Sequence, residues 1–479
     1  MKNVLLREKG WVNGEWIDSI NGATTPIYNP ATKMLLGEVA SLGAQETQIA
    51  IDGAQLALVD WKKVPARRRA NILHLWYQLI IKYQNELADI LTQEQGKVLS
   101  EARGEIIYAA NYVRWFAEEV LRINGEVLPG ESTSQKVIVS KHPIGVIAAI
   151  TPWNFPAAMI TRKVAPALAA GCTCIVKPSP ETPFTALALA ELAAQAGLPA
   201  GCLNIVPGDA IDIGSTLMQS EVVRKLSFTG STPVGKLLMA QAAQNVKRLS
   251  LELGGNAPFI VFSDADITKA VDAAMYGKFR NSGQTCVCIN RFLVHESVHD
   301  KFTNLLKNKM QALKVGNGII TSSDMGPLIN QQAVEKIKEH ILDAIEKGGE
   351  LLCGGDYFQQ ETLFFQPTLI TNGHSDMLAF SEETFGPLAV IYPFSTEEEA
   401  INLANKTEYG LAAYCFTQSL ATAWKMQEEL EYGMVGINST HISNEIVPFG
   451  GIKQSGFGRE GSHHGINEYL EIKYTLFGD

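Results

Sequence analysis

One cysteine stands where a nucleophile could work. Cys286 lies in a stretch of small residues at 281–287, between a helix-like run at 265–279 and a strand-like run at 289–294. Functional groups concentrate on such connections. A thiolate is a strong nucleophile, but free cysteine ionises with a pKa of about 8.5, so a working thiol needs surroundings that favour the anion. A cysteine considered alone is more often an inert core residue.

Two further groups would complete the chemistry of an acyl-transferring thiol. Glu252 lies 34 residues before Cys286 and could serve as a general base, and Asn154 could donate its side-chain amide to an oxyanion. The alternatives are a surface carboxylate and a polar turn residue between prolines. The flanking Leu251 and Leu253 favour a semi-buried carboxylate.

Composition narrows the class of protein. The 479 residues exceed what one hydrophobic core usually serves, so we expect two lobes. A net charge of −10 with dispersed acidic residues argues against a nucleic-acid partner. No apolar run approaches the roughly 20 residues of a membrane-spanning helix, and no signal peptide is apparent. Seven cysteines without a regular framework indicate reduced thiols and a cytoplasmic protein.

The order of apolar patterns predicts an α/β fold. Helical spacing at 50–61 and 67–91 is followed by short apolar strands that alternate with helical runs. This alternation is typical of βαβ units with a parallel sheet, which bind nucleotides at the carboxyl ends of the strands. A second α/β unit follows Gly255 and extends to about Gly451. The strands of the first unit are expected at 144–150, 172–177, 203–206, 225–228 and 248–251.

The segment 228–235 is the candidate phosphate site. No G-x-G-x-x-G follows the first strand, so a dinucleotide must be held differently. Here a strand ends at Gly230 and Ser231, and Pro233 can occupy the first turn of a helix whose free N–H groups face a pyrophosphate. The segment also approaches a Walker A loop, but Leu237 stands where the Mg²⁺-binding hydroxyl belongs.

A formal zinc motif is present at 295–299. His295 and His299 match H-E-x-x-H, which requires both rings on one helix face. The pattern instead places His295 at the end of a strand and Ser297 at the start of a helix. We therefore predict no metal site there.

Three segments together resemble the aldehyde dehydrogenase superfamily: 152–156, 251–255 and 382–387, in this order and spacing. The likeness extends over nearly the whole chain, and 283–288 with 442–444 resemble the succinate-semialdehyde dehydrogenase branch. The resemblance implies a parallel-sheet dinucleotide-binding domain (1–122 and 142–254), an α/β catalytic domain (255–453) and a small β oligomerisation arm (123–141 and 454–479). A homodimer or homotetramer is implied as well.

The resemblance also implies a mechanism. Cys286 would attack an aldehyde to form a thiohemiacetal, with the oxyanion held by Asn154 and by the N–H of Cys286. After hydride transfer to a nicotinamide, the thioester would be hydrolysed with Glu252 as general base. A catalytically silent relative and an acyl-CoA-forming variant are the alternatives, and intact Glu252 disfavours both. The expected cofactor-binding residues are Thr151, Trp153, Lys177, Ser179, Gly230, Ser231, Leu253, Glu383 and Phe385.

Cofactor choice depends on the end of the second strand of the sheet. Relatives that prefer NAD commonly carry Glu where this chain has Pro180, and that carboxylate repels a 2′-phosphate. Its absence leaves Lys177 and Ser179 free to meet the phosphate. We expect NADP to be preferred and NAD to be used more weakly, although Glu181 lies one residue away.

Two arginines predict an anionic substrate. Arg162 follows Asn154 by eight residues and Arg280 precedes Cys286 by six, so both lie on segments that carry catalytic groups. Either alone would more often pair with a carboxylate on a helix face. Together they favour bidentate capture of a carboxylate. By resemblance, Ser443 is a further anion contact, Phe449 packs the methylene stem, and the substrate is succinate semialdehyde, with glutarate semialdehyde weaker.

A redox role is the remaining hypothesis. Cys288 lies two residues from the nucleophile, and relatives with this Cys-x-Cys can form a reversible disulfide. The motif also occurs without such a switch, so a reversible disulfide and two thiols that never form one remain alternative hypotheses.

Overall fold

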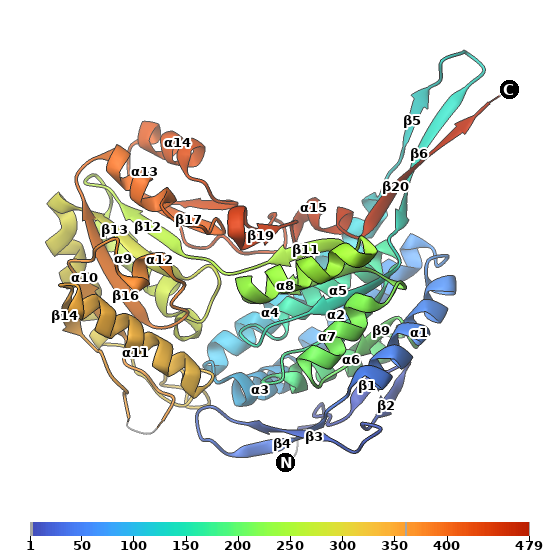
Figure 1. The fold of residues 1–479 in the computed structure, drawn as a ribbon, viewed down its shortest axis with the longest axis horizontal. Coiled ribbons are helices and arrows are strands. Elements are labelled where there is room, and N and C mark those ends of the chain that lie inside the picture. Colours follow the sequence, from blue (N-terminus) through green and yellow to red (C-terminus); the bar gives the residue numbers. More distant parts are fainter. Residues whose placement is uncertain (1–2, 360–361, 479) are drawn as a thin grey trace.

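The computed structural model describes residues 3–359 and 362–478, which form two lobes and a projecting arm (Figure 1). Over these residues the first lobe contains an eight-stranded sheet in the order β19-β11-β10-β7-β8-β9-β1-β2. The five central strands are parallel, and the edge strands pair antiparallel. The bounds are β19 Gly456–Phe457, β11 Arg248–Glu252, β10 Val223–Thr229, β7 Val146–Ile150, β8 Thr173–Lys177, β9 Leu203–Ile205, β1 Gly10–Val12 and β2 Glu15–Ile17.

Side chains of the central strands face two cores. In β7, Ile147 and Ala149 enter one core while Val146 and Ala148 enter the other, as the two-residue period of a strand requires. Helices α2 to α6 cover the first face, and α1, α7 and α8 cover the second. Their bounds are α1 Ala44–Trp61, α2 Ala66–Lys82, α3 Gln84–Gln95, α4 Leu99–Glu119, α5 Ala158–Ala170, α6 Pro183–Gln195, α7 Ala210–Gln219 and α8 Thr232–Ala242.

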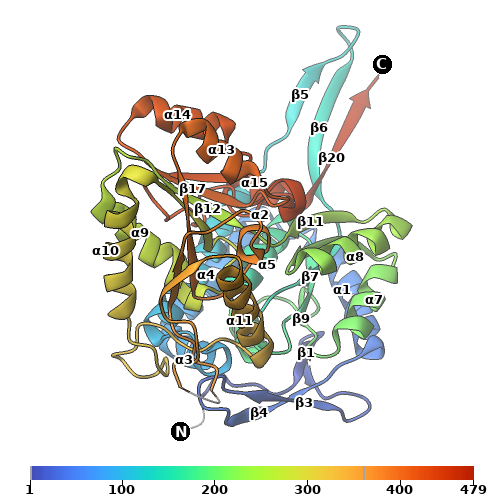
Figure 2. The same ribbon diagram turned by 60° about the vertical axis from the view of Figure 1, so that its left-hand side comes forward.

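The second lobe has a sheet of its own (Figure 2). In the described part of the chain it has seven strands in the order β14-β15-β16-β13-β12-β17-β18. All pairs are parallel except β14 with β15. The strands are β12 Ala257–Val261, β13 Ile289–His295, β14 Glu350–Cys353, β15 Thr368–Thr371, β16 Leu388–Phe394, β17 Ala412–Phe416 and β18 Met434–Ile437.

Helices cover both faces of this second sheet. The helices α9 and α10 pack on one core, and α11 to α14 pack on the other. The connection from α9 to β13 carries Cys286, as the sequence predicts. The helices are α9 Ile267–Phe279, α10 His299–Gln311, α11 Gln331–Glu346, α12 Leu378–Ser381, α13 Glu397–Asn405 and α14 Leu420–Glu429.

A three-stranded antiparallel arm projects from the body (Figure 1). It joins β5 (Glu126–Pro129), β6 (Lys136–Pro143) and β20 (Leu470–Phe477). The expected arm segment 454–479 is divided, because β19 pairs with β11 in the first sheet and α15 (Ser462–Asn467) packs on α4 and α5. A separate hairpin joins β3 (Thr24–Tyr28) and β4 (Leu35–Ala40).

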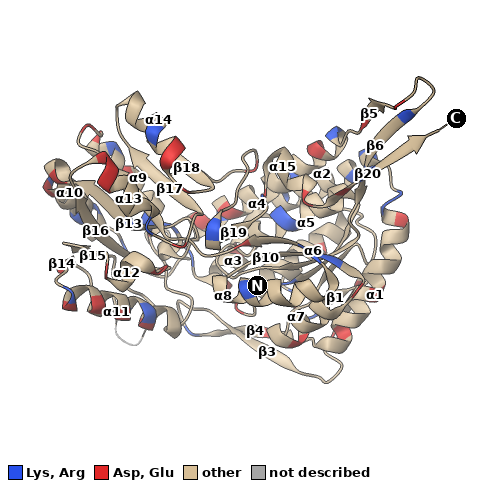
Figure 3. Ribbon diagram, turned by 45° about the horizontal axis from the view of Figure 1, so that its top comes forward, with Lys and Arg blue, Asp and Glu red and all other residues tan. Residues whose placement is uncertain are grey.

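Basic and acidic residues are interspersed along the described chain (Figure 3). Within residues 3–359 and 362–478, no helix is both long and apolar enough to cross a membrane. The histidines of the H-E-x-x-H motif lie on different elements. His295 ends β13 and accepts a hydrogen bond from the N–H of Ser297. His299 begins α10, and its Nε2 forms a hydrogen bond with the Thr371 hydroxyl.

Candidate active site

Cys286 lies on a strained connection. After α9, Asn281 and Ser282 adopt φ of 51° and 58°, and Gly283 follows at 76°. Such left-handed non-glycine residues are uncommon and gather at functional sites. A Cβ at Gly283 would lie 2.3 Å from the carbonyl oxygen of Gly386, so only glycine fits. The chain therefore enters the Cys286 loop through a fixed bend.

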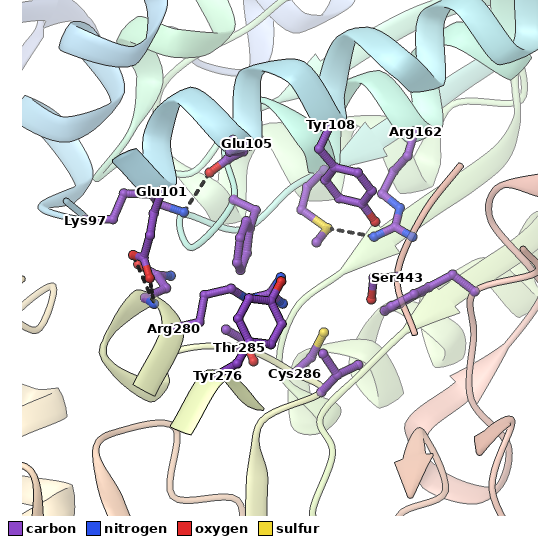
Figure 4. Close-up of a pocket in the computed structure, with 16 residues that line it drawn as sticks. Lys97, Glu101, Glu105, Tyr108, Arg162, Tyr276, Arg280, Thr285, Cys286 and Ser443 are labelled. Carbon is purple, nitrogen blue, oxygen red and sulfur yellow. Dashed lines mark hydrogen bonds and ion pairs between the residues drawn. The ribbon is translucent and has the colours of Figure 1, made fainter. Parts of the chain in front are cut away.

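A cavity of about 470 Å³ opens on one side of Cys286 (Figure 4). It brings together the residues that the sequence predicts for substrate binding, although they come from three distant segments of the chain. Those residues are Arg162, Arg280, Ser443 and Phe449.

The two guanidinium groups are held differently. Arg162 is buried, its Nε lies 2.6 Å from Glu460 Oε2, and its guanidinium lies 4.1 Å from the centre of the Phe449 ring. Arg280 donates from Nη1 to the Tyr276 hydroxyl at 2.9 Å. The alternative of an ion pair thus holds for Arg162, but its partner Glu460 is buried between β19 and α15 and does not lie on an outer helix face.

A second cavity, of about 230 Å³, lies on the other side of Cys286. At its wall the Trp153 and Phe385 rings meet edge to face, with centroids 5.6 Å apart. Phe385 has φ of 55°, a further strained position. The predicted residues that line this cavity are Trp153, Asn154, Gly230, Ser231, Leu253, Cys286, Glu383 and Phe385.

The second cavity is suited to a dinucleotide. It lies where β7, β10 and β11 end, at the carboxyl edge of the parallel sheet. Ser231 precedes α8, and its side chain makes no capping hydrogen bond, so N–H groups of the first turn remain for a phosphate. Thr151, Lys177 and Ser179 lie outside this cavity, further along the same sheet edge, where the Thr151 N–H bonds to the Lys177 carbonyl.

The Cys286 thiol and the nearby Glu383 carboxyl group are shifted towards their neutral forms. Burial raises the pKa of the Cys286 thiol to about 12, and nearby Glu383 and Glu252 act in the same direction while Arg162 and Arg280 oppose them. Burial also raises the pKa of Glu383 to about 7. The thiol is therefore neutral at pH 7 in this conformation and must be activated.

Glu252 is a buried carboxyl group at the end of β11. Burial raises its pKa well above the usual range, and Glu460 contributes in the same direction. In the described part of the chain neither carboxyl oxygen has a hydrogen-bond partner. It lines neither cavity in this conformation. We expect it to act after its side chain has turned towards Cys286.

Asn154 is held tightly at the junction of the cavities. The side-chain Nδ2 of Asn154 donates to the Gln284 backbone carbonyl at 3.1 Å. The backbone carbonyl of Asn154 accepts from Lys97 Nζ and Asn281 Nδ2. Asn154 and Cys286 line the same cavity.

The sequence of this chain matches those of known proteins. A profile of the aldehyde dehydrogenase family matches residues 16–475. This chain is a member of the aldehyde dehydrogenase family. It is 58% identical to the succinate semialdehyde dehydrogenase of Acinetobacter baylyi and 53% identical to the NADP(+) succinate-semialdehyde dehydrogenase GabD of Escherichia coli, each over 99% of this chain and 98% of the relative.

Solved structures confirm the predicted fold class. The crystal structure of succinate-semialdehyde dehydrogenase from Burkholderia pseudomallei superimposes with a TM-score of 0.98 at 54% identity, covering 99% of this chain and 98% of that one. The aldehyde dehydrogenase architecture, with its parallel-sheet domain and separate catalytic sheet, is therefore shown for this chain.

Several residues that line the 470 Å³ cavity of this aldehyde dehydrogenase were not predicted from the sequence. Lys97, Glu101, Glu105 and Tyr108 follow one face of α4 and its approach. Their spacing of three or four residues was a readable signal, since it places them on one side of a helix. Glu460 had no such signal, because it reaches Arg162 only through tertiary packing.

Cys288 is buried beside a lysine. Its Sγ lies 3.4 Å from Lys278 Nζ, and burial raises the pKa of the thiol. Both Cys286 and Cys288 are free thiols in the structure. The redox hypothesis stays a prediction.

Proposed function

We propose that the protein oxidises succinate semialdehyde to succinate, with NADP as the preferred cofactor. The observation that carries this proposal is the position of Cys286 between two cavities, one with Arg162 and Arg280 and one at the carboxyl edge of a parallel sheet. Sequence identities of 58% and 53% to two succinate-semialdehyde dehydrogenases, each over 99% of this chain, support the proposal.

Each end of the substrate has a chemical counterpart in the site. A C4 semialdehyde carries its carboxylate at one end and its reacting carbon at the other, and Ser443 lies with Arg162 and Cys286 on the wall of one cavity (Figure 4). Guanidinium groups bind carboxylates with charge-assisted hydrogen bonds. Phe449 supplies an apolar surface for the two methylene groups.

Each of the proposed catalytic residues then serves a different step of the reaction. Once the thiol has lost its proton, the Cys286 sulfur bonds to the aldehyde carbon while the C=O π pair moves to oxygen, and the Asn154 amide and the Cys286 N–H stabilise that oxyanion. When bound, the nicotinamide supplies the hydride acceptor. Glu252 takes a proton from the water that hydrolyses the thioester, which returns Cys286 and releases the carboxylate product.

An aldehyde panel assayed with and without coenzyme A tests this function. We expect reduced cofactor to form fastest with succinate semialdehyde, more slowly with glutarate semialdehyde, and without any requirement for coenzyme A. One methylene discriminates by only about 1–3 kcal/mol, so the C5 substrate should still react. Formation of an acyl-CoA, or no turnover with any aldehyde, would contradict the proposal.

NADP preference rests on Lys177. Its ammonium is buried, which lowers its pKa, while Glu181 and Asp209 counteract this effect. Ser179 donates to the Glu181 carboxylate, so a negative charge lies beside the expected 2′-phosphate site. Lys177 must therefore bind the 2′-phosphate of NADP although the negative charge of Glu181 repels that phosphate.

Substitution of Lys177 by methionine should lower kcat/KM for NADP by about 10–100-fold, as expected for loss of a charge-assisted contact, and affect NAD less. Glu181→Gln should shift the preference further towards NADP. Steady-state kinetics with both cofactors measures these ratios, and a tenfold preference of the unaltered enzyme for NAD would refute the assignment.

We also propose that the arm forms the interface of a homodimer or homotetramer. It exposes large apolar side chains on both faces of β5, β6 and β20, and apolar surface of this kind marks interaction sites. These side chains are Val127, Leu128, Ile138, Ile472, Tyr474, Leu476 and Phe477.

Peroxide is expected to inactivate the enzyme, and dithiothreitol should restore activity if Cys286 and Cys288 form a disulfide. Because burial raises the pKa of both thiols, inactivation should be faster at higher pH, where more thiolate is present. Residual activity after timed exposure provides the measurement. Equal reversibility in Cys288→Ala would argue against the disulfide.

A further inference from the structure

A buried ion pair lies beneath the loop that carries Asn154. Lys97 places Nζ 2.6 Å from Glu105 Oε2 and 2.7 Å from the Asn154 carbonyl oxygen. Both charged side chains are at most 1% exposed. The same ammonium lies 3.8 Å from the centre of the Phe155 ring. Lys97 therefore contacts the Asn154 loop through a backbone carbonyl and an aromatic face, while its ion pair joins it to Glu105 on α4.

The other oxygen of Glu105 holds the helix that carries Arg162. Glu105 Oε1 accepts hydrogen bonds from the N–H groups of Ala157 at 2.9 Å and Ala158 at 3.3 Å. These residues begin α5, where a carboxylate is favoured by the unpaired N–H groups and the helix dipole. Arg162 follows Ala158 by four residues, about one helical turn.

The pair thus connects the two ends of the proposed substrate site. Asn154 faces the reacting aldehyde end, and Arg162 faces the carboxylate end. Asn281 reinforces one side of this connection, because its Nδ2 donates to the Asn154 carbonyl at 3.0 Å. The polar atoms of Lys97 and Glu105 are engaged by each other and by backbone groups, although both side chains line the cavity (Figure 4).

We propose that Lys97 and Glu105 are positioning residues that fix the separation between the Asn154 amide and the Arg162 guanidinium, and thereby the chain length of the semialdehyde. The proposal rests on the proposed function and deepens it. A pair of purely structural importance would affect only folding, and neutral replacement of a buried ion pair often leaves stability nearly unchanged.

The test is the double variant Lys97→Met with Glu105→Gln, which removes both charges together. We expect kcat to fall by on the order of 10²-fold, because a misplacement of about 1 Å near the reacting atoms has that effect. The kcat/KM preference for succinate over glutarate semialdehyde should fall towards unity, while KM for the cofactor should change little. Unchanged kcat and chain-length preference would overturn the proposal.

Glu94→Gln is the matched control. Glu94 is also a buried carboxyl group that accepts from two successive N–H groups at a helix start, those of Phe184 and Thr185 at 2.8 Å each. That helix, α6, carries none of the site residues assigned above. We expect lower thermal stability without loss of chain-length preference, and equal kinetic effects in the control and the pair variant would contradict the positioning role.

A double-mutant cycle with Asn154→Ala separates positioning from general damage. If the Lys97–Glu105 pair acts through the Asn154 amide, removing the pair from an enzyme that already carries Asn154→Ala should lower kcat only slightly further. Fully multiplicative losses would refute the proposal. If the double variant does not fold, Glu105→Gln alone keeps an acceptor for Ala157 and Ala158, and an unaltered kcat in that variant is equally decisive.

The cycle is measured with whichever aldehyde of the panel reacts fastest. Failure of the proposed function would appear as equal use of succinate semialdehyde and butanal by the unaltered enzyme. Failure of the positioning role would appear only in the variants.

Discussion

Replacement of Cys286 by alanine is expected to abolish turnover, whereas Glu252→Gln should release one equivalent of reduced cofactor per active site and then stop. The two residues serve successive steps, because the thiol is needed for every bond to the substrate and the carboxylate only for hydrolysis of the thioester. Rapid-mixing measurement of cofactor absorbance distinguishes a burst from no reaction. Complete loss of the burst in both variants would refute the role of Glu252 in deacylation.

The environment of Glu252 adds a pH dependence to this experiment. Burial, with Glu460, raises its pKa, so the carboxyl group binds a proton at pH values where an ordinary glutamate is ionised. Only the ionised form can accept a proton from water. Steady-state kcat should therefore rise with pH through the raised pKa wherever deacylation limits the rate, and Glu252→Gln should lose that rise.

Succinate semialdehyde should be preferred over butanal by about a hundredfold or more in kcat/KM, since butanal has the same carbon count without the carboxylate. A site built for an anion leaves its arginines unpaired when the neutral aldehyde binds. Arg162→Ala and Arg280→Ala should each reduce this preference greatly, mainly by loss of activity with the semialdehyde. Parallel kinetics with the two aldehydes provides the measurement.

Arg280→Ala is the cleaner of the two variants, because Arg162 also pairs with Glu460 and its removal leaves Glu460 with Lys163. Arg114→Ala is a suitable control. Arg114 lies on α4, is 44% exposed, and reaches Glu445 only at 3.9 Å, so its loss should change neither rate. If the unaltered enzyme uses butanal equally well, the semialdehyde assignment is wrong while membership of the aldehyde dehydrogenase family stands.

Local patterns were sufficient to predict the architecture, whereas the roles of the reacting groups were predicted from the resemblance to the aldehyde dehydrogenase superfamily. The period of apolar residues marked β7, β8, β10 and β11, and their parallel arrangement places the residues that follow each strand at one sheet edge. Gly230 and Ser231 could therefore be placed at this edge from the pattern, and the resemblance added Trp153 and Leu253; all four line one cavity.

The position of Cys286 on the connection between α9 and β13 was equally readable from sequence. The two arginines could be placed on segments that carry catalytic groups, because each lies within ten residues of one. The sequence itself shows how few residues separate each arginine from a catalytic group.

Tertiary structure alone decided how these groups are held. Glu460 lies almost 300 residues from Arg162, and Lys97 lies 57 residues from the Asn154 carbonyl that it contacts. No periodicity relates such pairs, since their contact depends on how helices, a C-terminal segment and two sheets pack. The sequence by itself determined which residues could do the chemistry, and the packing determined which buried charges hold them, because desolvation makes a buried charge depend on partners that only the folded chain brings together.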